Sequence, residues 1–252
     1  MTVNEFGAEL YRRLSISDFP FDMSLNGFQI NGPDRELRKA AFAVDASFCT
    51  IDKAAEASAD ILIVHHGLFW GSPIAITDAH YRRVKRALDS SLSLFACHLP
   101  LDAHPLYGNN AQIALTLGMT SFDPFGEFRG HKIGFKGSLP FLMTVPEVAR
   151  LLGFSSETGM HMIKAGKDMV ETVGIISGGG AEDVTQAIDE GLDLFITGTA
   201  EHEIYHTVRE SCINFLSGGH YRSEVFGVKA LERMARKEFG LDTIFIDAET
   251  GL

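Results

Sequence analysis

A strand–helix–strand pattern that recurs 133 positions later constrains this fold more than any other feature of the sequence. At that offset residues 193–197 (Asp-Leu-Phe-Ile-Thr) align with residues 60–64 (Asp-Ile-Leu-Ile-Val), and residues 173–176 align with residues 40–43. Between these strands Val184, Ala187 and Ile188 fall on Ile51, Ala54 and Ala55. Because three matches lie in one register, the sequence predicts two similar α/β domains that arose by internal duplication.

The rest of the chain also alternates apolar runs with stretches of helical periodicity, which is typical of an α/β protein. Strands are expected at 40–45, 60–64, 92–97, 172–177, 193–197, 213–217 and 243–247. Helices are expected at 3–14, 49–58, 79–90, 108–117, 145–152, 181–190, 201–211 and 222–238. The turn-rich stretch 123–126 (Asp-Pro-Phe-Gly) is the expected start of the second copy.

Charge and cysteine content exclude several classes of protein. The formal net charge of −11 would repel a phosphate backbone, so nucleic acid is not expected as a partner. An N-terminal signal and an apolar run long enough for a membrane span are not evident, so a cytoplasmic protein without a membrane partner is expected. Three cysteines without a Cys-x-x-Cys pair predict neither a disulfide framework nor a thiolate zinc site.

Metal-binding side chains follow three of the expected strands. His65 and His66 end one strand, Asp102 follows the next, and His220 and Glu224 lie after the glycine turn Gly218-Gly219. The carboxyl ends of strands in an α/β sheet are where ligand sites collect, and imidazole with carboxylate suits iron, manganese, zinc or cobalt. Five donors are too many for one catalytic ion, so two ions that share a carboxylate fit the count.

Each motif taken alone has a structural explanation. A lone His-His pair is more often a polar strand cap, and His220 with Glu224 is equally typical of a hydrogen bond at a helix start. Asn109 and Asn110 are interpreted as structural, because either is equally well explained as a helix N-cap, and the three glycines of 178–180 are interpreted as a permissive tight turn. Asp45 and His98 are predicted to orient the imidazoles without binding metal themselves.

A metalloprotease pattern, His-Glu-x-x-His, occurs at residues 202–206. It lies at the very start of its expected helix, and the chain has no third zinc ligand at the downstream spacing of such enzymes. We interpret this match as accidental.

The combined motifs resemble the GTP cyclohydrolase I type 2 homologue family, also called the Nif-three-like family. The resemblance covers residues 20 to 235 and rests on the segments 26–32, 64–70, 98–105, 108–111, 175–179 and 195–198, and on Gly219-His220 with Glu224. It implies a first domain of residues 1–124 plus 220–252 that carries most ligands, a second domain of residues 125–219, and a dinuclear metal site in the cleft between them. By this resemblance one ion takes His65 and Asp102, the other takes His66 and His220, and Glu224 bridges. A homohexamer is also implied.

Two functions follow as hypotheses. The first is a metal-dependent hydrolase resembling GTP cyclohydrolase, in which two divalent ions activate water against a small-molecule substrate such as a nucleotide. The second is a non-catalytic protein, either an iron carrier or a regulatory interaction protein, because a fold does not fix a function.

Overall fold

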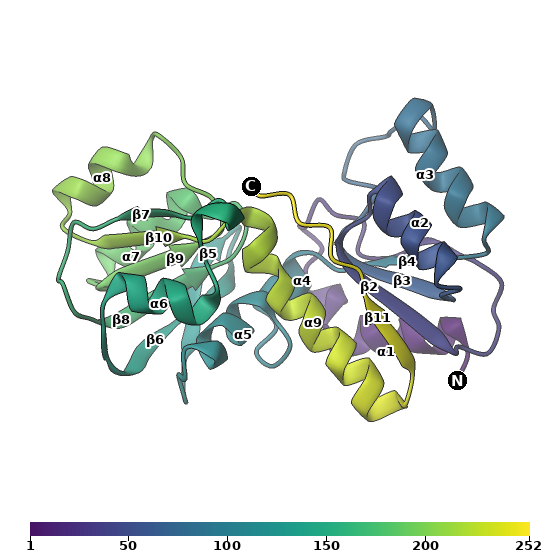
Figure 1. Ribbon diagram of the computed structural model, residues 1–252, viewed down its shortest axis with the longest axis horizontal. Coiled ribbons are helices and arrows are strands. Elements are labelled where there is room, and N and C mark those ends of the chain that lie inside the picture. The colour runs from purple at the N-terminus through teal and green to yellow at the C-terminus, as the bar shows by residue number, and fades with distance from the viewer. The chain divides into compact units, whose positions relative to one another are not determined.

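The computed structural model describes all 252 residues, and the chain divides into two compact units. The first unit comprises residues 1–101 and 228–248, and the second comprises residues 102–227 and 249–252. These boundaries differ from the predicted ones, because residues 102–124, 220–227 and 249–252 belong to the second unit and not to the first. The α/β class is confirmed, with one sheet in each unit (Figure 1).

The first unit contains a five-stranded sheet in the order β1-β4-β3-β2-β11. Its strands are β1 (Gly27–Ile30), β2 (Lys39–Asp45), β3 (Ile61–His66), β4 (Ser93–Ala96) and β11 (Asp242–Phe245). All neighbours are parallel except β1, which pairs antiparallel with β4 at the edge. Parallel strands need crossover connections, and the helices between them provide these.

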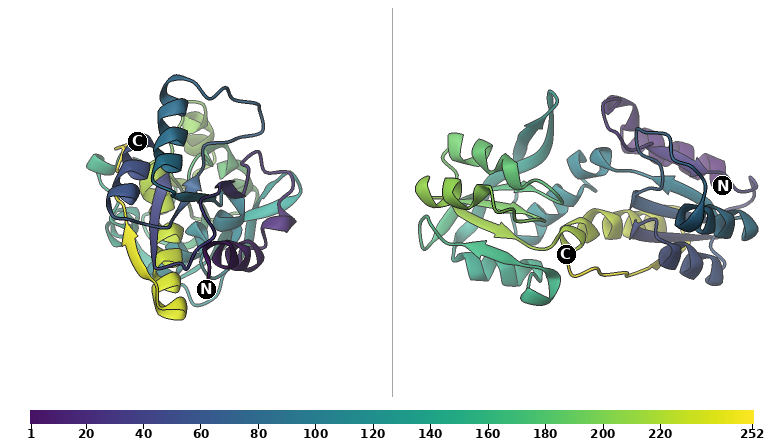
Figure 2. Two further views of the ribbon diagram at one scale, coloured as in Figure 1. Left: turned by 90° about the vertical axis from the view of Figure 1, so that its right-hand side faces the viewer. Right: turned by 90° about the horizontal axis from the view of Figure 1, so that it is seen from above.

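Helices cover both faces of this first sheet. α2 (Phe48–Glu56) and α3 (Asp78–Asp89) lie on one face, and α1 (Val3–Arg13) lies on the other with the later part of α9 (His220–Phe239) (Figure 2, left). Side chains alternate along a strand, so Leu62 and Val64 join the apolar cluster under α2 and α3. Phe6 of α1 packs edge-on against Phe239 of α9, with ring centroids 5.4 Å apart.

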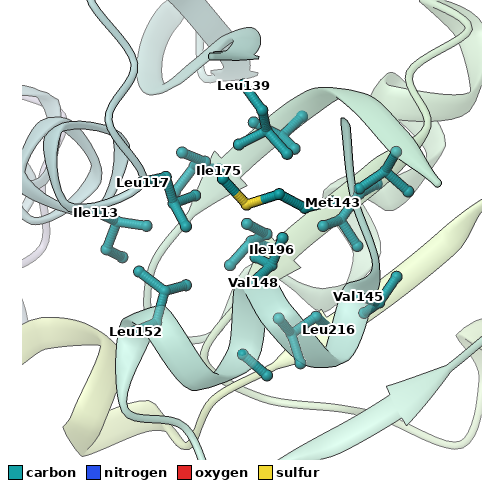
Figure 3. Packing of buried hydrophobic residues seen from close by; sticks show 14 of the residues in the cluster. Ile113, Leu117, Leu139, Met143, Val145, Val148, Leu152, Ile175, Ile196 and Leu216 are labelled. Carbon is teal, nitrogen blue, oxygen red and sulfur yellow. The ribbon is translucent and has the colours of Figure 1, made fainter. Parts of the chain in front are cut away.

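The second unit contains a six-stranded sheet in the order β5-β6-β8-β9-β10-β7. Its strands are β5 (Asp123–Phe128), β6 (His131–Met143), β7 (His161–Ile163), β8 (Val170–Ile176), β9 (Leu194–Thr197) and β10 (Asn214–Ser217). Its helices are α5 (Asn109–Thr116), α6 (Val145–Leu152), α7 (Val184–Asp189) and α8 (Ile204–Glu210), and the short α4 (Leu99–Ala103) crosses into it from the first unit. Figure 3 shows one side of its core, where α5 and α6 pack on β8, β9 and β10.

The predicted repeat is present in connectivity and in register. β2 pairs with β3 as Ala40 with Ile61, and β8 pairs with β9 as Val173 with Leu194, both parallel and 133 residues apart. In each unit the next strand, β4 or β10, is parallel to the previous one and is flanked by an antiparallel edge strand. The two strand–helix–strand segments therefore share one topology, and an origin by duplication stays a prediction.

An aspartate in front of the second strand repeats as well. Asp60 accepts hydrogen bonds from the backbone N–H groups of Arg38 and Lys39, at 2.9 and 3.0 Å. Asp193 accepts from those of Glu171 and Thr172, at 3.0 and 3.2 Å, and all three positions are shifted by the same 133 residues. In both places a carboxylate holds the start of the neighbouring strand.

Sequence patterns missed the antiparallel strands. The stretch 123–126, expected as a turn, forms the first four of the six residues of β5. Gly126 adopts φ +71° within this strand, which pairs with β6. β6 has lysines, glycines and a proline among its apolar residues, and β7 has only three residues, so neither gives a clear strand period. None of the helices combines the length and the hydrophobicity that a membrane span requires.

Candidate metal-binding site

The first unit brings three imidazoles together at the carboxyl ends of neighbouring strands. β3 ends at His65 and His66, and His98 follows β4. One nitrogen from each ring lies within 4.8 Å of the other two, and the ring centroids of His65 and His66 are 4.6 Å apart. His98, predicted only to orient its neighbours, is placed as close as a ligand would be, with its centroid 5.1 Å from that of His65.

An acceptor fixes the Nδ1 atom of each of these rings. His65 Nδ1 lies 2.9 Å from the carbonyl oxygen of Cys97, and His66 Nδ1 lies 2.9 Å from Asp45 Oδ1. His98 Nδ1 lies 2.9 Å from Asp22 Oδ1. Because carbonyl and carboxylate oxygens only accept, each ring donates from Nδ1, and in the neutral ring Nε2 is then the nitrogen with a lone pair. Proteins use this arrangement to orient histidines that bind metal.

Asp22 also belongs to this group, although no sequence pattern indicated it. Its carboxylate accepts from His98 Nδ1, from the backbone N–H of Leu99 at 3.0 Å and from Asn26 Nδ2 at 2.8 Å. Burial raises the pKa of Asp22, but the hydrogen bond and charge of His98, with smaller contributions from Asn26 and Ser24, bring the pKa below its ordinary value. Asp22 lies 76 residues from His98, so no local spacing could have indicated it.

A glutamine fixes the turn that follows the two histidines. Gln29 Oε1 accepts from the backbone N–H groups of Leu68 and Phe69, at 2.6 and 3.2 Å. A Cβ atom at Gly67 would lie 2.3 Å from Gln29 Nε2, so only glycine allows this approach. Gln29 lies in the segment 26–32 that carried part of the family resemblance. One role of that segment is therefore to hold the turn after His65 and His66.

The second unit holds the other predicted ligands, Asp102, His220 and Glu224. Asp102 lies in α4, and the other two lie four residues apart in the first turns of α9. His220 Nε2 is 3.2 Å from Glu224 Oε1, and a carboxylate oxygen of Asp102 lies within 4.8 Å of one of Glu224. Asp102 and Glu224 are both buried, with 6% and 3% of their surfaces exposed. Two of the five predicted ligands therefore lie in the first unit and three in the second.

Buried polar side chains position Asp102. Asn109 Nδ2 and Ser177 Oγ both donate to Asp102 Oδ1, each at 2.9 Å. The N-cap interpretation of the two asparagines is wrong, since Gly108 caps α5. Asn109 Oδ1 instead accepts from the backbone N–H of Gly227, and Asn110 bonds the backbone of Asp102.

The glycine turn after β8 lies against Glu224. Gly178 adopts φ +65°, and a Cβ atom there would lie 2.3 Å from Glu224 Oε1. Its N–H donates to Ser223 Oγ at 2.9 Å, which joins the turn to α9. The tight turn predicted at residues 178–180 is confirmed, and its first glycine leaves the room that the Glu224 carboxylate occupies.

The metalloprotease pattern does not form a site. α8 begins at Ile204, after the first two residues of the pattern, and His202, Glu203 and His206 are all exposed. A metalloprotease needs both histidines on one face of a helix around a shared ion. The accidental interpretation agrees with this geometry.

Comparison with known proteins finds one family over the whole chain. The family model described as Duf34/NIF3 (NGG1p interacting factor 3) matches residues 1–251. A protein of Deinococcus radiodurans named GTP cyclohydrolase 1 type 2 homolog is 45% identical over 240 residues, covering 95% of this chain and 90% of that protein. A protein of the same name from Archaeoglobus fulgidus is 43% identical over 231 residues and 92% of each chain.

Solved structures with the same fold cover the chain completely. The protein TTHA1606 from Thermus thermophilus superposes with a TM-score of 0.90 at 40% sequence identity, over 100% of both chains. A protein called ybgI, of unknown function, superposes with a TM-score of 0.90 at 31% identity, again over 100% of both chains.

Proposed function

Because this chain belongs to the Duf34/NIF3 family, we propose that it binds two divalent metal ions and acts as a metal-dependent hydrolase. The ligands proposed are His65, His66, Asp102, His220 and Glu224. The observation that carries the proposal is the hydrogen bonding of the first-unit imidazoles, each of which donates from Nδ1 to a fixed acceptor. Such rings are held in the tautomer and the orientation that metal binding requires.

The donor chemistry fits hard or borderline divalent ions. Neutral imidazoles and carboxylates without thiolates suit iron, manganese, zinc or cobalt. Five protein donors make six bonds if Glu224 bridges, about three to each ion, which leaves positions open as catalytic sites require. The buried carboxylate of Glu224, held against Gly178, is the donor that we assign to the bridge.

In this proposal the side chains of the protein would bind the metal ions and orient the ligands, and the ions would activate water. When bound, such ions lower the pKa of water and polarise the bond under attack. Asp45 and the Cys97 carbonyl fix the rings of His66 and His65, while Asn109 and Ser177 fix the Asp102 carboxylate. We propose a small-molecule substrate with a heterocycle or a phosphate, by the name that the relatives carry.

Metal content of purified variants tests the ligand assignment. Glu224→Ala should empty both sites, because each proposed ion loses a shared donor, whereas Asp102→Ala should weaken mainly one. His202→Ala removes a histidine of the metalloprotease pattern and should leave metal content unchanged. Elemental analysis measures all three, and full metal occupancy in Glu224→Ala would contradict the bridge.

Activity needs a separate test with defined metals. Iron, manganese, zinc and cobalt forms of the protein are assayed on GTP and on a panel of hydrolase substrates. We expect at least one form to turn over, with activity falling in Glu224→Ala in proportion to its metal loss. If every form is inactive while bound metal passes readily to an acceptor apoprotein, the hydrolase proposal fails and the carrier function replaces it.

A further inference from the structure

The only tryptophan of the chain lies beside the imidazole cluster, and its side chain reaches the solvent. The Trp70 indole is 36% exposed, and its centroid is 4.9 Å from that of His98 at an interplanar angle of 76°. The His66 ring lies 5.9 Å away at 44°. The indole therefore offers a planar apolar surface beside these imidazoles, and part of that surface is open to solvent.

The indole is fixed in place by several independent contacts. Trp70 Nε1 donates to the carbonyl oxygen of Gly67 at 3.0 Å, within the turn that Gln29 holds. The backbone of Trp70 forms an isolated bridge with Ser24, and the N–H of Gly71 donates to the carbonyl oxygen of Met23 at 2.6 Å. The single polar group of the ring is therefore used inside the chain, and what its exposed part offers a ligand is π surface.

We infer that Trp70 is a stacking platform for a planar heterocyclic ring, a purine or a ring of similar size, next to the imidazole cluster. Every nucleobase has a π face, and an aromatic side chain can stack on that face whatever hydrogen-bond donors and acceptors the base carries. A protein of net charge −11 gains from such a contact, because its overall field disfavours an anionic substrate. The inference rests on the proposed function and names the substrate class of that site.

Fluorescence tests the contact directly, since all indole emission comes from Trp70. The probes are guanosine, which has the ring and no charge, and ribose, which lacks the ring. We expect guanosine to change the emission with a saturable curve in both the metal-free and the zinc-loaded protein, and ribose to leave it unchanged. An absence of any change with guanosine, or an equal change with ribose, overturns the inference.

Variants of Trp70 test whether its ring stacks on the ligand or only positions His98. Trp70→Leu should weaken guanosine binding about 5- to 100-fold in equilibrium dialysis, and Trp70→Phe by less than about 5-fold, because a smaller ring still stacks. Tyr205→Leu, a control at a residue of α8 that is 44% exposed, should bind as the wild type does. Zinc content should stay unchanged in all three.

The two proposals fail in different ways. Wild-type guanosine affinity in Trp70→Leu, or a loss of zinc that accounts for its loss of guanosine binding, contradicts the platform and leaves the metal site standing. A wild-type protein that holds no metal contradicts the proposed function, while the guanosine titration of the metal-free protein still decides the platform.

Discussion

At the scale of single residues, hydrogen bonds with neighbouring groups hold three of the predicted ligands, His65, His66 and Asp102, in place. The sequence indicated His65, His66, Asp102, His220 and Glu224 because such side chains at strand ends are typical of metal sites. It could not indicate the acceptors that come from far along the chain, such as Asp22, or the amides of Asn109 and Asn110, because those contacts exist only after folding. Asp45 was the exception, since it ends a strand next to β3.

Asp45 gives the first prediction. Asp45→Ala removes the acceptor from His66 Nδ1, so the ring loses its fixed tautomer, and metal affinity should fall about 10- to 100-fold. Asp45→Asn should cost less, because an amide oxygen still accepts. Competition with a chelator of known affinity measures both variants. Asp89→Ala, at an exposed ion pair with Lys85, is the control, and an equal loss there would show that the effect is not local.

At the scale of elements, the strand–helix–strand repeat was visible in sequence because its strands are buried, parallel and therefore uniformly apolar. The antiparallel edges β1, β5 and β7 were not visible, because short strands with polar or turn-forming residues give no period. The repeat extends to Asp60 and Asp193, whose carboxylates hold equivalent strand starts. An alignment of apolar residues finds the strands, but only the hydrogen bonds show why both copies keep an aspartate.

The glycine turn after β8 can be tested against a matched turn. Gly178 and Gly191 have φ +65° and +67°, but a Cβ atom at Gly191 would meet nothing within 4 Å. Gly191→Ala should therefore cost only the left-handed backbone strain, about 1 kcal/mol of unfolding free energy. Gly178→Ala should cost more and should also release metal, because the new methyl displaces Glu224. Urea unfolding and elemental analysis measure the pair, and equal effects would exclude the clash.

The two aspartates predict an acid limit to stability. Burial alone would raise the pKa of each aspartate, but hydrogen bonds and charges outweigh it. The backbone N–H groups of Lys39 and Arg38 lower the pKa of Asp60 below its ordinary value. The Lys167 ammonium and the backbone N–H groups of Glu171 and Thr172 do the same for Asp193. Both folded pKa values lie below the unfolded value of about 4. The stabilisation is therefore complete above about pH 4 and is lost as the pH falls through the folded pKa values.

Substitution of one aspartate tests this limit. Asp193→Asn should lower the unfolding free energy at pH 7 by about 1–3 kcal/mol and flatten its decline below pH 4. Asp189→Asn, at an exposed position near the end of α7, should change it by less than about 0.5 kcal/mol. Urea titrations from pH 7 to pH 3 give both quantities, and an unchanged pH profile in Asp193→Asn would contradict the assignment.

At the scale of the whole molecule, we expect copies of this chain to associate. The family resemblance implies a homohexamer, and the second unit exposes apolar side chains such as Phe141 and Leu142, at 66% and 54%. Exposed apolar groups of this kind are often covered by another subunit. We expect light scattering to report about six protomers of 27.6 kDa, and a monomer at micromolar concentration would refute the expectation.

The division of the first unit along the chain also sets the order in which the two sheets become complete. During synthesis from the N-terminus, β1 to β4 of the first sheet emerge before any strand of the second. A nascent chain that has reached residue 227 contains every strand of the second sheet but only four of the five in the first. About two hundred residues are synthesised between β2, which carries Asp45, and its neighbour β11. The ribosome therefore finishes last the sheet that it began first.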